Sequence, residues 1–128
     1  MSQFANGKRI ILVVEDDGLI RMDAADMVRN LGFETIEAAN ADEAISLLEG
    51  CSDIAVVFTD IQMPGSMDGL RLVAVIRDRW PPIALLVTSG QASPPAAALP
   101  LGARFISKPY MRHELQTHLS ALTSFGSA

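Results

Sequence analysis

The chain has 128 residues, of which 49% are hydrophobic and 20% charged, and it carries a net charge of −5. This length and composition fit one globular domain with a single core and exclude a disordered chain. The negative charge disfavours nucleic acid and anionic membrane surfaces as partners, because both require basic patches. No apolar run reaches the length of a bilayer span, no leader-like stretch opens the sequence, and the lone Cys51 suits a reducing compartment, so we expect a cytoplasmic location.

Short apolar runs rich in β-branched residues predict three strands that are buried on both faces, at 10–14, 54–58 and 83–87. Two weaker strand candidates lie at 33–38 and 103–107. The polar and unpatterned residues 1–7 predict a loose tail, and we expect the same of residues 123–128.

Apolar residues spaced three and four positions apart predict a helix after each of the first three strands and after the fifth. Glycine or proline follows three of these patterns and ends the helix. The segment 89–102 between the fourth and fifth strands contains three prolines and no charged residue, so a helix there should be short or irregular. The four apolar faces consist of Ile20, Ala24, Val28 and Leu31; Ala41, Ala44, Ile45 and Leu48; Leu72, Ile76 and Trp80; and Met111, Leu115, Leu119 and Leu122.

The regular alternation of strands and helices predicts an α/β fold with a doubly wound, five-stranded parallel sheet and helices on both faces. We expect a single domain over residues 8–122. Sheets of this kind place their functional site at the carboxyl ends of the strands. Those ends carry Glu15, Asp16 and Asp17 after the first strand, Asp60 after the third, Thr88 and Ser89 after the fourth, and Lys108 after the fifth.

Carboxylates that gather at one edge repel each other unless a cation lies among them, and oxygen ligands of this kind suit Mg²⁺. A carboxylate beside Mg²⁺ can attack phosphorus while the ion neutralises the charge of the transferred group. A nearby ammonium and hydroxyl would then hold the phosphoryl oxygens. An isolated aspartate at a strand end is usually only a turn former, so the prediction depends on all four strand ends together.

This set of strand ends resembles the receiver domain of two-component response regulators, in particular single-domain members similar to chemotaxis regulators. The matching segments are ILVVEDD, DIQMPGSMDG, LLVTSG and GARFISKP. The resemblance implies the flavodoxin-like strand order 2-1-3-4-5, which the strand pattern alone does not give. One departure is the segment MPGSMDG, which is one residue longer than usual and places an extra residue in the loop after the third strand.

The resemblance also implies roles for individual residues. Asp60 is the expected phosphoacceptor, and it would bind Mg²⁺ together with Glu15, Asp16 and the main-chain carbonyl of Gln62. The acidic pair has two registers in the segment EDD, and we place it on Glu15 and Asp16. Asp17 is then the N-cap of the following helix.

Three further positions match the part of the family that responds to phosphorylation. Thr88 matches the switch hydroxyl, and Lys108 matches the lysine that binds the phosphoryl group and precedes a cis Pro109. Phe105 matches the aromatic residue that changes its packing on activation.

We therefore predict a receiver that accepts a phosphoryl group from the phosphohistidine of a sensor histidine kinase and signals by altered binding to a downstream protein, which the sequence does not identify. It would be no enzyme beyond promoting its own phosphorylation and dephosphorylation. One alternative is a receiver module of a larger protein or hybrid kinase. A second is a phosphohydrolase with an aspartyl-phosphate intermediate, which is disfavoured because Gln62 stands where such enzymes carry a second aspartate.

Overall fold

The computed structural model describes residues 10–91 and 94–123, and its centre is one parallel sheet with the strand order β2-β1-β3-β4-β5. The strands are β1 (Ile10–Val14), β2 (Glu34–Ala38), β3 (Ile54–Asp60), β4 (Ala84–Ser89) and β5 (Arg104–Ser107). This order confirms the one implied by the resemblance. The three most apolar strands, β1, β3 and β4, are the central strands of the sheet. A central strand of a parallel sheet is covered on both faces, so its side chains are apolar and buried.

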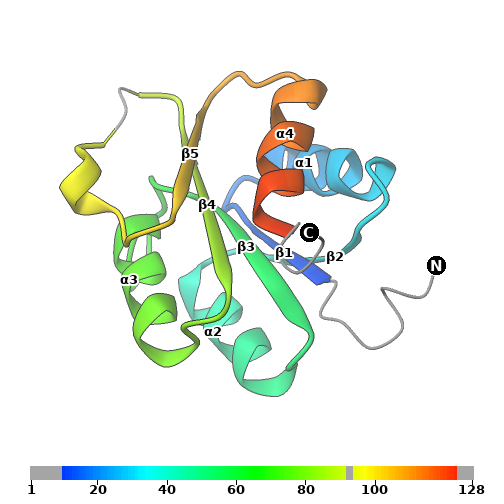
Figure 1. The fold of residues 1–128 in the computed structure, drawn as a ribbon. Helices are drawn as coiled ribbons and strands as arrows, with labels where there is room; N and C mark the ends of the chain where they lie inside the picture. Colours follow the sequence, from blue (N-terminus) through cyan, green and yellow to red (C-terminus); the bar gives the residue numbers. More distant parts are fainter. Residues whose placement is uncertain (1–9, 92–93, 124–128) are drawn as a thin grey trace.

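Helices cover the sheet on both faces, as predicted (Figure 1). Helices α1 (Gly18–Asn30) and α4 (Arg112–Thr123) lie on one face, whereas α2 (Ala41–Gly50) and α3 (Gly69–Arg79) lie on the other. Each face buries its own hydrophobic cluster against the sheet. Within the part of the chain that the structure describes, no helix has the length and apolar character that a bilayer crossing requires.

The ends of α1 follow the sequence prediction. Asp17 is the N-cap, and its Oδ1 accepts hydrogen bonds from the backbone N–H groups of Leu19 and Ile20 at 3.0 and 3.1 Å. Gly32, with φ of 99°, ends the helix in a conformation that glycine favours. Ile20 belongs to the predicted apolar face but is 43% exposed, because the first turn of α1 starts at the carboxyl edge of the sheet and has little of the sheet beneath it.

Among the described residues of the connection between β4 and β5, the one regular element is a short 3₁₀ helix, η2 (Ala96–Ala98), which confirms the prediction of a short or irregular element. Leu99 packs against the hydrophobic cluster on the α2 and α3 face, while Leu101 is 95% exposed. Residues 92–93 lie outside the described residues. So do the predicted tail 1–7, the predicted domain start at Lys8, and residues 124–128; Thr123 is the last residue of α4.

The loop between β3 and α3 accommodates its extra residue by a local turn. Gly65 has φ of 110°, and the hydroxyl of the next residue, Ser66, donates a hydrogen bond of 2.7 Å to Asp42 on α2. Asp68 then caps α3 by accepting a hydrogen bond from the N–H of Arg71. The loop therefore returns to a regular helix start directly beside the end of β3.

Gly69, the first residue of α3, touches the backbone at the end of β3. Its N–H donates to the carbonyl of Ile61 at 2.8 Å, and a Cβ added to it would overlap the main-chain carbonyl of Asp60. Only glycine permits this approach without moving backbone. The contact fixes the segment that carries the Asp60 side chain.

We expect Gly69→Ala to lower the free energy of unfolding by about 3 kcal/mol, because the methyl group would force the end of β3 and the start of α3 apart. Urea unfolding followed by circular dichroism would measure the loss. Gly50→Ala is the matched control, since an added Cβ at Gly50 meets no atom within 4 Å. Equal losses in the two variants would contradict the importance of the close approach.

Candidate functional site

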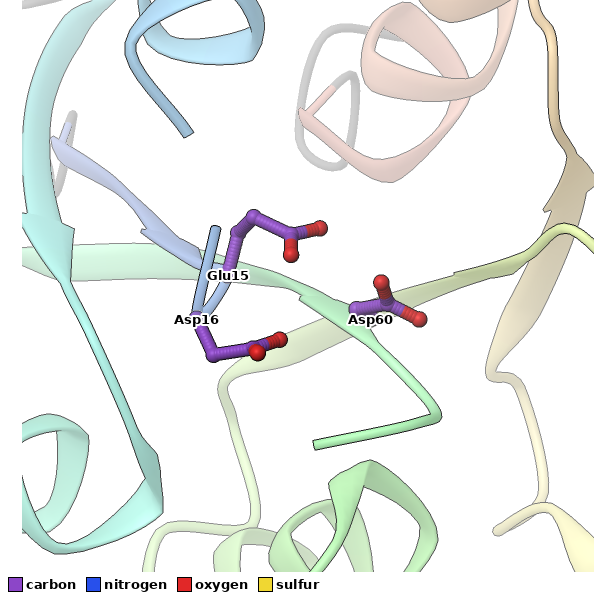
Figure 2. Close-up of side chains that lie close together, drawn as sticks. All are labelled: Glu15, Asp16 and Asp60. Atoms are coloured by element: carbon purple, nitrogen blue, oxygen red, sulfur yellow. The ribbon is translucent and has the colours of Figure 1, made fainter. Parts of the chain in front are cut away.

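Three carboxylates meet at the carboxyl edge of the sheet (Figure 2). Glu15 and Asp16 directly follow β1, and Asp60 is the last residue of the neighbouring strand β3. One carboxylate oxygen from each of the three lies within 4.8 Å of the other two. Glu15 and Asp60 are buried, whereas Asp16 is exposed, so the cluster is open to solvent on the Asp16 side.

Both carboxylate oxygens of Asp60 have a hydrogen-bond donor. The backbone N–H of Gln62 donates to Oδ1 at 3.1 Å, and the ammonium of Lys108 donates to Oδ2 at 2.6 Å. The side chain of Asp60 is therefore held in one orientation at the mouth of the strand. A charge-assisted contact of this length is among the stronger hydrogen bonds in proteins.

Lys108 also contacts Glu15, at 3.2 Å from Nζ to Oε1. Burial lowers the pKa of Lys108, but the hydrogen bond to Asp60 and the charges of Asp60 and Glu15 outweigh this effect and leave the pKa above its ordinary value. Burial raises the pKa of Glu15, the hydrogen bond from the N–H of Asp17 opposes this rise, and the neighbouring Asp60 adds to it. A single ammonium thus holds two buried carboxylates.

Thr88 lies on β4 directly opposite Asp60 in the register of the two strands. Its side chain is buried, and among the described residues its hydroxyl has no hydrogen-bond partner. A buried hydroxyl without a partner costs free energy, so it is available to bind an oxygen that arrives in the site.

The structure also describes the other residues that the sequence predicted for the site. The bond between Lys108 and Pro109 is cis, as the resemblance implied. Asp17 is occupied as the N-cap of α1, which agrees with the register chosen for the acidic pair. Phe105 is half-buried on β5, and its ring packs against the hydrophobic cluster on the α2 and α3 face.

Sequence reasoning missed two residues that shape the site. Arg21 on α1 donates a hydrogen bond of 3.0 Å to the main-chain carbonyl of Glu15, and Gly69 supports the backbone of Asp60. Glycine in the segment MDG was a usable signal for the close approach. The contact of Arg21 depends on how α1 folds back over the end of β1, which the spacing of apolar residues does not reveal.

The arrangement has the chemical requirements of a phosphoryl acceptor. Carboxylate oxygens at this separation can share a hard divalent cation such as Mg²⁺, and the exposure of Asp16 leaves room for its water ligands. The Asp60 carboxylate could act as a nucleophile, and the Lys108 ammonium places a positive charge 2.6 Å from it. The buried hydroxyl of Thr88 has no hydrogen-bond partner among the described residues.

A sequence model of the response regulator receiver domain matches residues 11–120 of the chain. The chain is 32% identical over 116 residues to the sensor kinase CckA of Brucella abortus, covering 88% of this chain and 12% of that protein. It is 34% identical over 110 residues to the transcriptional regulatory protein PdtaR of Mycobacterium tuberculosis, covering 84% of this chain and 53% of that protein. The chain therefore spans about half or less of the length of these curated relatives.

Solved structures show the same similarity. The receiver domain of the hybrid histidine kinase CckA superposes with a TM-score of 0.73 at 30% identity, covering 88% of this chain and 97% of that one. A response regulator receiver protein from Sinorhizobium medicae superposes with a TM-score of 0.84 at 24% identity, covering 92% of this chain and 95% of that one. At 24% identity, the similarity to the Sinorhizobium medicae protein shows the fold alone. The similarity to the CckA receiver domain also agrees with the sequence match to the sensor kinase CckA.

We expect Lys108→Met to lower the free energy of unfolding by about 2 kcal/mol in the presence of a chelator, because Glu15 and Asp60 would then lose their shared cation. Added Mg²⁺ should recover part of the loss. Urea unfolding with EDTA and with MgCl₂ would measure both effects. Lys108→Arg, which keeps the charge, is the control, and an equal loss in both variants would contradict the electrostatic explanation.

Proposed function

The chain belongs to the response regulator receiver domain family, and from this we propose that it accepts a phosphoryl group on Asp60 from the phosphohistidine of a sensor histidine kinase. The observation that carries the proposal is the Asp60 carboxylate, which lies between a cluster of acidic side chains and the Lys108 ammonium 2.6 Å away. On one side of Asp60, the acidic cluster could bind a cation. On the other side, the Lys108 ammonium already provides a positive charge.

Glu15, Asp16, Asp60 and the main-chain carbonyl of Gln62 are the residues that would hold Mg²⁺. When bound, Mg²⁺ supplies positive charge that offsets the charge of the transferred phosphoryl group. In the transfer, a carboxylate oxygen of Asp60 forms a bond to phosphorus while the bond from phosphorus to the imidazole nitrogen of the donor breaks. The imidazole leaves with the electron pair of that bond.

Lys108 and Thr88 would then bind oxygens of the phosphoryl group. The group adds about −1.5 to −2 charges near neutral pH, by analogy with phosphorylated hydroxyl groups. Lys108 would exchange its contact with Asp60 Oδ2 for a phosphoryl oxygen, and the free hydroxyl of Thr88 would gain a partner. These changes alter the surface formed by β4 and β5, including Phe105, and with it the affinity for a downstream protein.

The surface beside the site supports a protein as the phosphoryl donor. A cavity of about 470 Å³ next to Lys108 is lined by α1 and by the segment that follows β5, including Ile20 and Tyr110. Large apolar side chains are exposed on the same two segments, as is common where a protein partner docks. They are Leu19, Ile20 and Met22 on α1 and Met111 just before α4.

The same site chemistry would serve in a receiver module of a longer protein. This alternative is supported by the matched relatives, of which the chain spans 12% in the case of the sensor kinase CckA. In either case the function of Asp60 is the same, and only the protein that responds to it differs.

We expect Asp60→Asn to abolish the mass gain of one phosphoryl group that acetyl phosphate and Mg²⁺ produce in the wild-type protein, because an amide is a far poorer nucleophile than a carboxylate. Intact-protein mass spectrometry would measure the adduct. Asp53→Asn, an exposed change just before the opposite end of β3, should be phosphorylated as well as the wild type. An adduct that persists in Asp60→Asn would show that another residue is the acceptor.

We expect Asp16→Ala to weaken Mg²⁺ binding by at least about tenfold, because it removes a direct ligand from the proposed site. Asp17→Ala should leave the Mg²⁺ affinity nearly unchanged and cost about 1 kcal/mol of stability through the lost helix cap. Calorimetric titration with MgCl₂ and urea unfolding would separate the two effects. The opposite pattern would mean that the acidic pair consists of Asp16 and Asp17.

A further inference from the structure

The main-chain carbonyl of Glu15 lies just past the end of β1 and takes a hydrogen bond from a side chain. In both ladders that β1 forms, with β2 and with β3, the last paired residue of β1 is Val14. The Nη1 of Arg21, on α1, donates to the Glu15 carbonyl at 3.0 Å. The carbonyl at this position is therefore held by α1 and not by the sheet.

This carbonyl belongs to the peptide that joins the two proposed Mg²⁺ ligands that follow β1. Glu15 and Asp16 are adjacent, and a carboxylate oxygen of each lies close to one of Asp60 (Figure 2). A peptide is planar from one Cα to the next, so the direction of its C=O restrains how the following residue leaves it. Asp16 is exposed, so side-chain packing does little to hold it. The position of the Asp16 carboxylate therefore depends on the orientation of this peptide.

Arg21 is itself held by an acidic side chain on the edge strand β2. Its Nε lies 3.4 Å from Oε1 of Glu37, and Oε2 of Glu37 lies 3.2 Å from Nη2 of Arg29, farther along α1. A guanidinium is planar and its donors are at fixed angles, so the contact at Nε helps to set the direction of Nη1. The side chains of Arg21 and Glu37 are only 24% and 29% exposed, so solvent competes less for this contact than it does at an open surface.

We infer that Arg21, oriented by Glu37, is a positioning residue that raises the Mg²⁺ affinity of the acidic cluster by fixing the peptide between Glu15 and Asp16. This inference rests on the proposed function of the cluster. The support acts against the charge of Arg21, because a cation near the cluster would by itself repel Mg²⁺. The ion pair with Glu37 offsets that charge, so Arg21 can hold the peptide with little repulsion of the metal ion.

Calorimetric titration of the folded full chain with MgCl₂ tests the inference. Arg21→Met should weaken Mg²⁺ binding about fivefold, which corresponds to the net contribution of one hydrogen bond. If Arg21 acted through its charge alone, its removal would instead strengthen Mg²⁺ binding. Arg29→Met is the matched control, because it also removes an arginine from Glu37 but leaves the Glu15 carbonyl with its partner. Its Mg²⁺ affinity should stay near the wild-type value.

Two further variants keep the test decisive if Arg21→Met folds poorly or loses stability. Arg21→Lys keeps the positive charge, but an ammonium lacks the planar fork of donors, so Mg²⁺ binding should weaken here too. Glu37→Gln should weaken Mg²⁺ binding in the wild-type background and have no further effect beside Arg21→Met, since Glu37 acts through Arg21. An effect of Glu37→Gln that is equal in both backgrounds would contradict this order of action.

The mass gain from acetyl phosphate separates a failure of this inference from a failure of the proposed function. At saturating MgCl₂, Arg21→Met should gain the Asp60 adduct as fast as the wild type, because only the affinity for the ion is changed. A slower gain that persists at saturation would contradict a role in metal positioning. If Arg21→Met and Arg21→Lys both bind Mg²⁺ as tightly as a wild type that gains the adduct, the role of Arg21 is wrong while Asp60 stands. If the wild type neither binds Mg²⁺ nor gains mass, the proposed function and the inference both fail.

Discussion

The contact between the Lys108 ammonium and the Asp60 carboxylate, at 2.6 Å, is the interaction on which the carboxyl edge of the sheet depends. Asp60 and Glu15 end neighbouring strands, and both side chains are buried, so their charges would repel each other without a cation. Lys108 directly follows β5, two strands away from β3, and only a long and flexible side chain can reach across β4 to both carboxylates. The compact ammonium suits this position better than a planar guanidinium.

The surroundings of this ion pair divide into a fixed part and a free part. Gly69, the Asp68 cap and the Gln62 N–H hold the backbone and one oxygen of Asp60, and Ser89 is held by three hydrogen bonds. The hydroxyl of Thr88, in contrast, has no partner among the described residues. The backbone around Asp60 is thus held rigidly, while the neighbouring Thr88 hydroxyl can still accept a new partner. A ligand oxygen that arrives at Asp60 would therefore bind to a site whose geometry is already set.

The sequence predicted those features that depend on neighbours along the chain. Apolar runs predicted the central strands, glycine or proline after an apolar pattern predicted where a helix ends, and Asp17 was recognised as a cap. The strand order came from the family resemblance, since periodicity does not say which strands pair. The contacts Lys108–Glu15 and Ser89–Gln62 could not be predicted, because they join residues far apart in sequence whose side chains meet only when the strand ends are aligned. The exposure of Ile20 was missed for a related reason: helical periodicity does not show where the sheet beneath the helix ends.

The irregular connection between β4 and β5 would determine how a signal at Asp60 reaches the outer edge of the sheet. Between Arg79 and Arg104 the chain has no charged residue. In the part of the β4–β5 connection that the structure describes, its prolines leave a single 3₁₀ turn, η2. Thr88 and Lys108 are instead connected by the β4–β5 ladder, in which the N–H of Lys108 binds the carbonyl of Ser89. A displacement of Thr88 toward a phosphoryl group would therefore act on β5 directly through backbone hydrogen bonds. The described residues of this connection contain no α-helix that would have to move with β5 as a rigid body. The response of this face would then depend on how firmly the short strand β5 is held by Phe105 and Ile106, which pack in the two hydrophobic clusters.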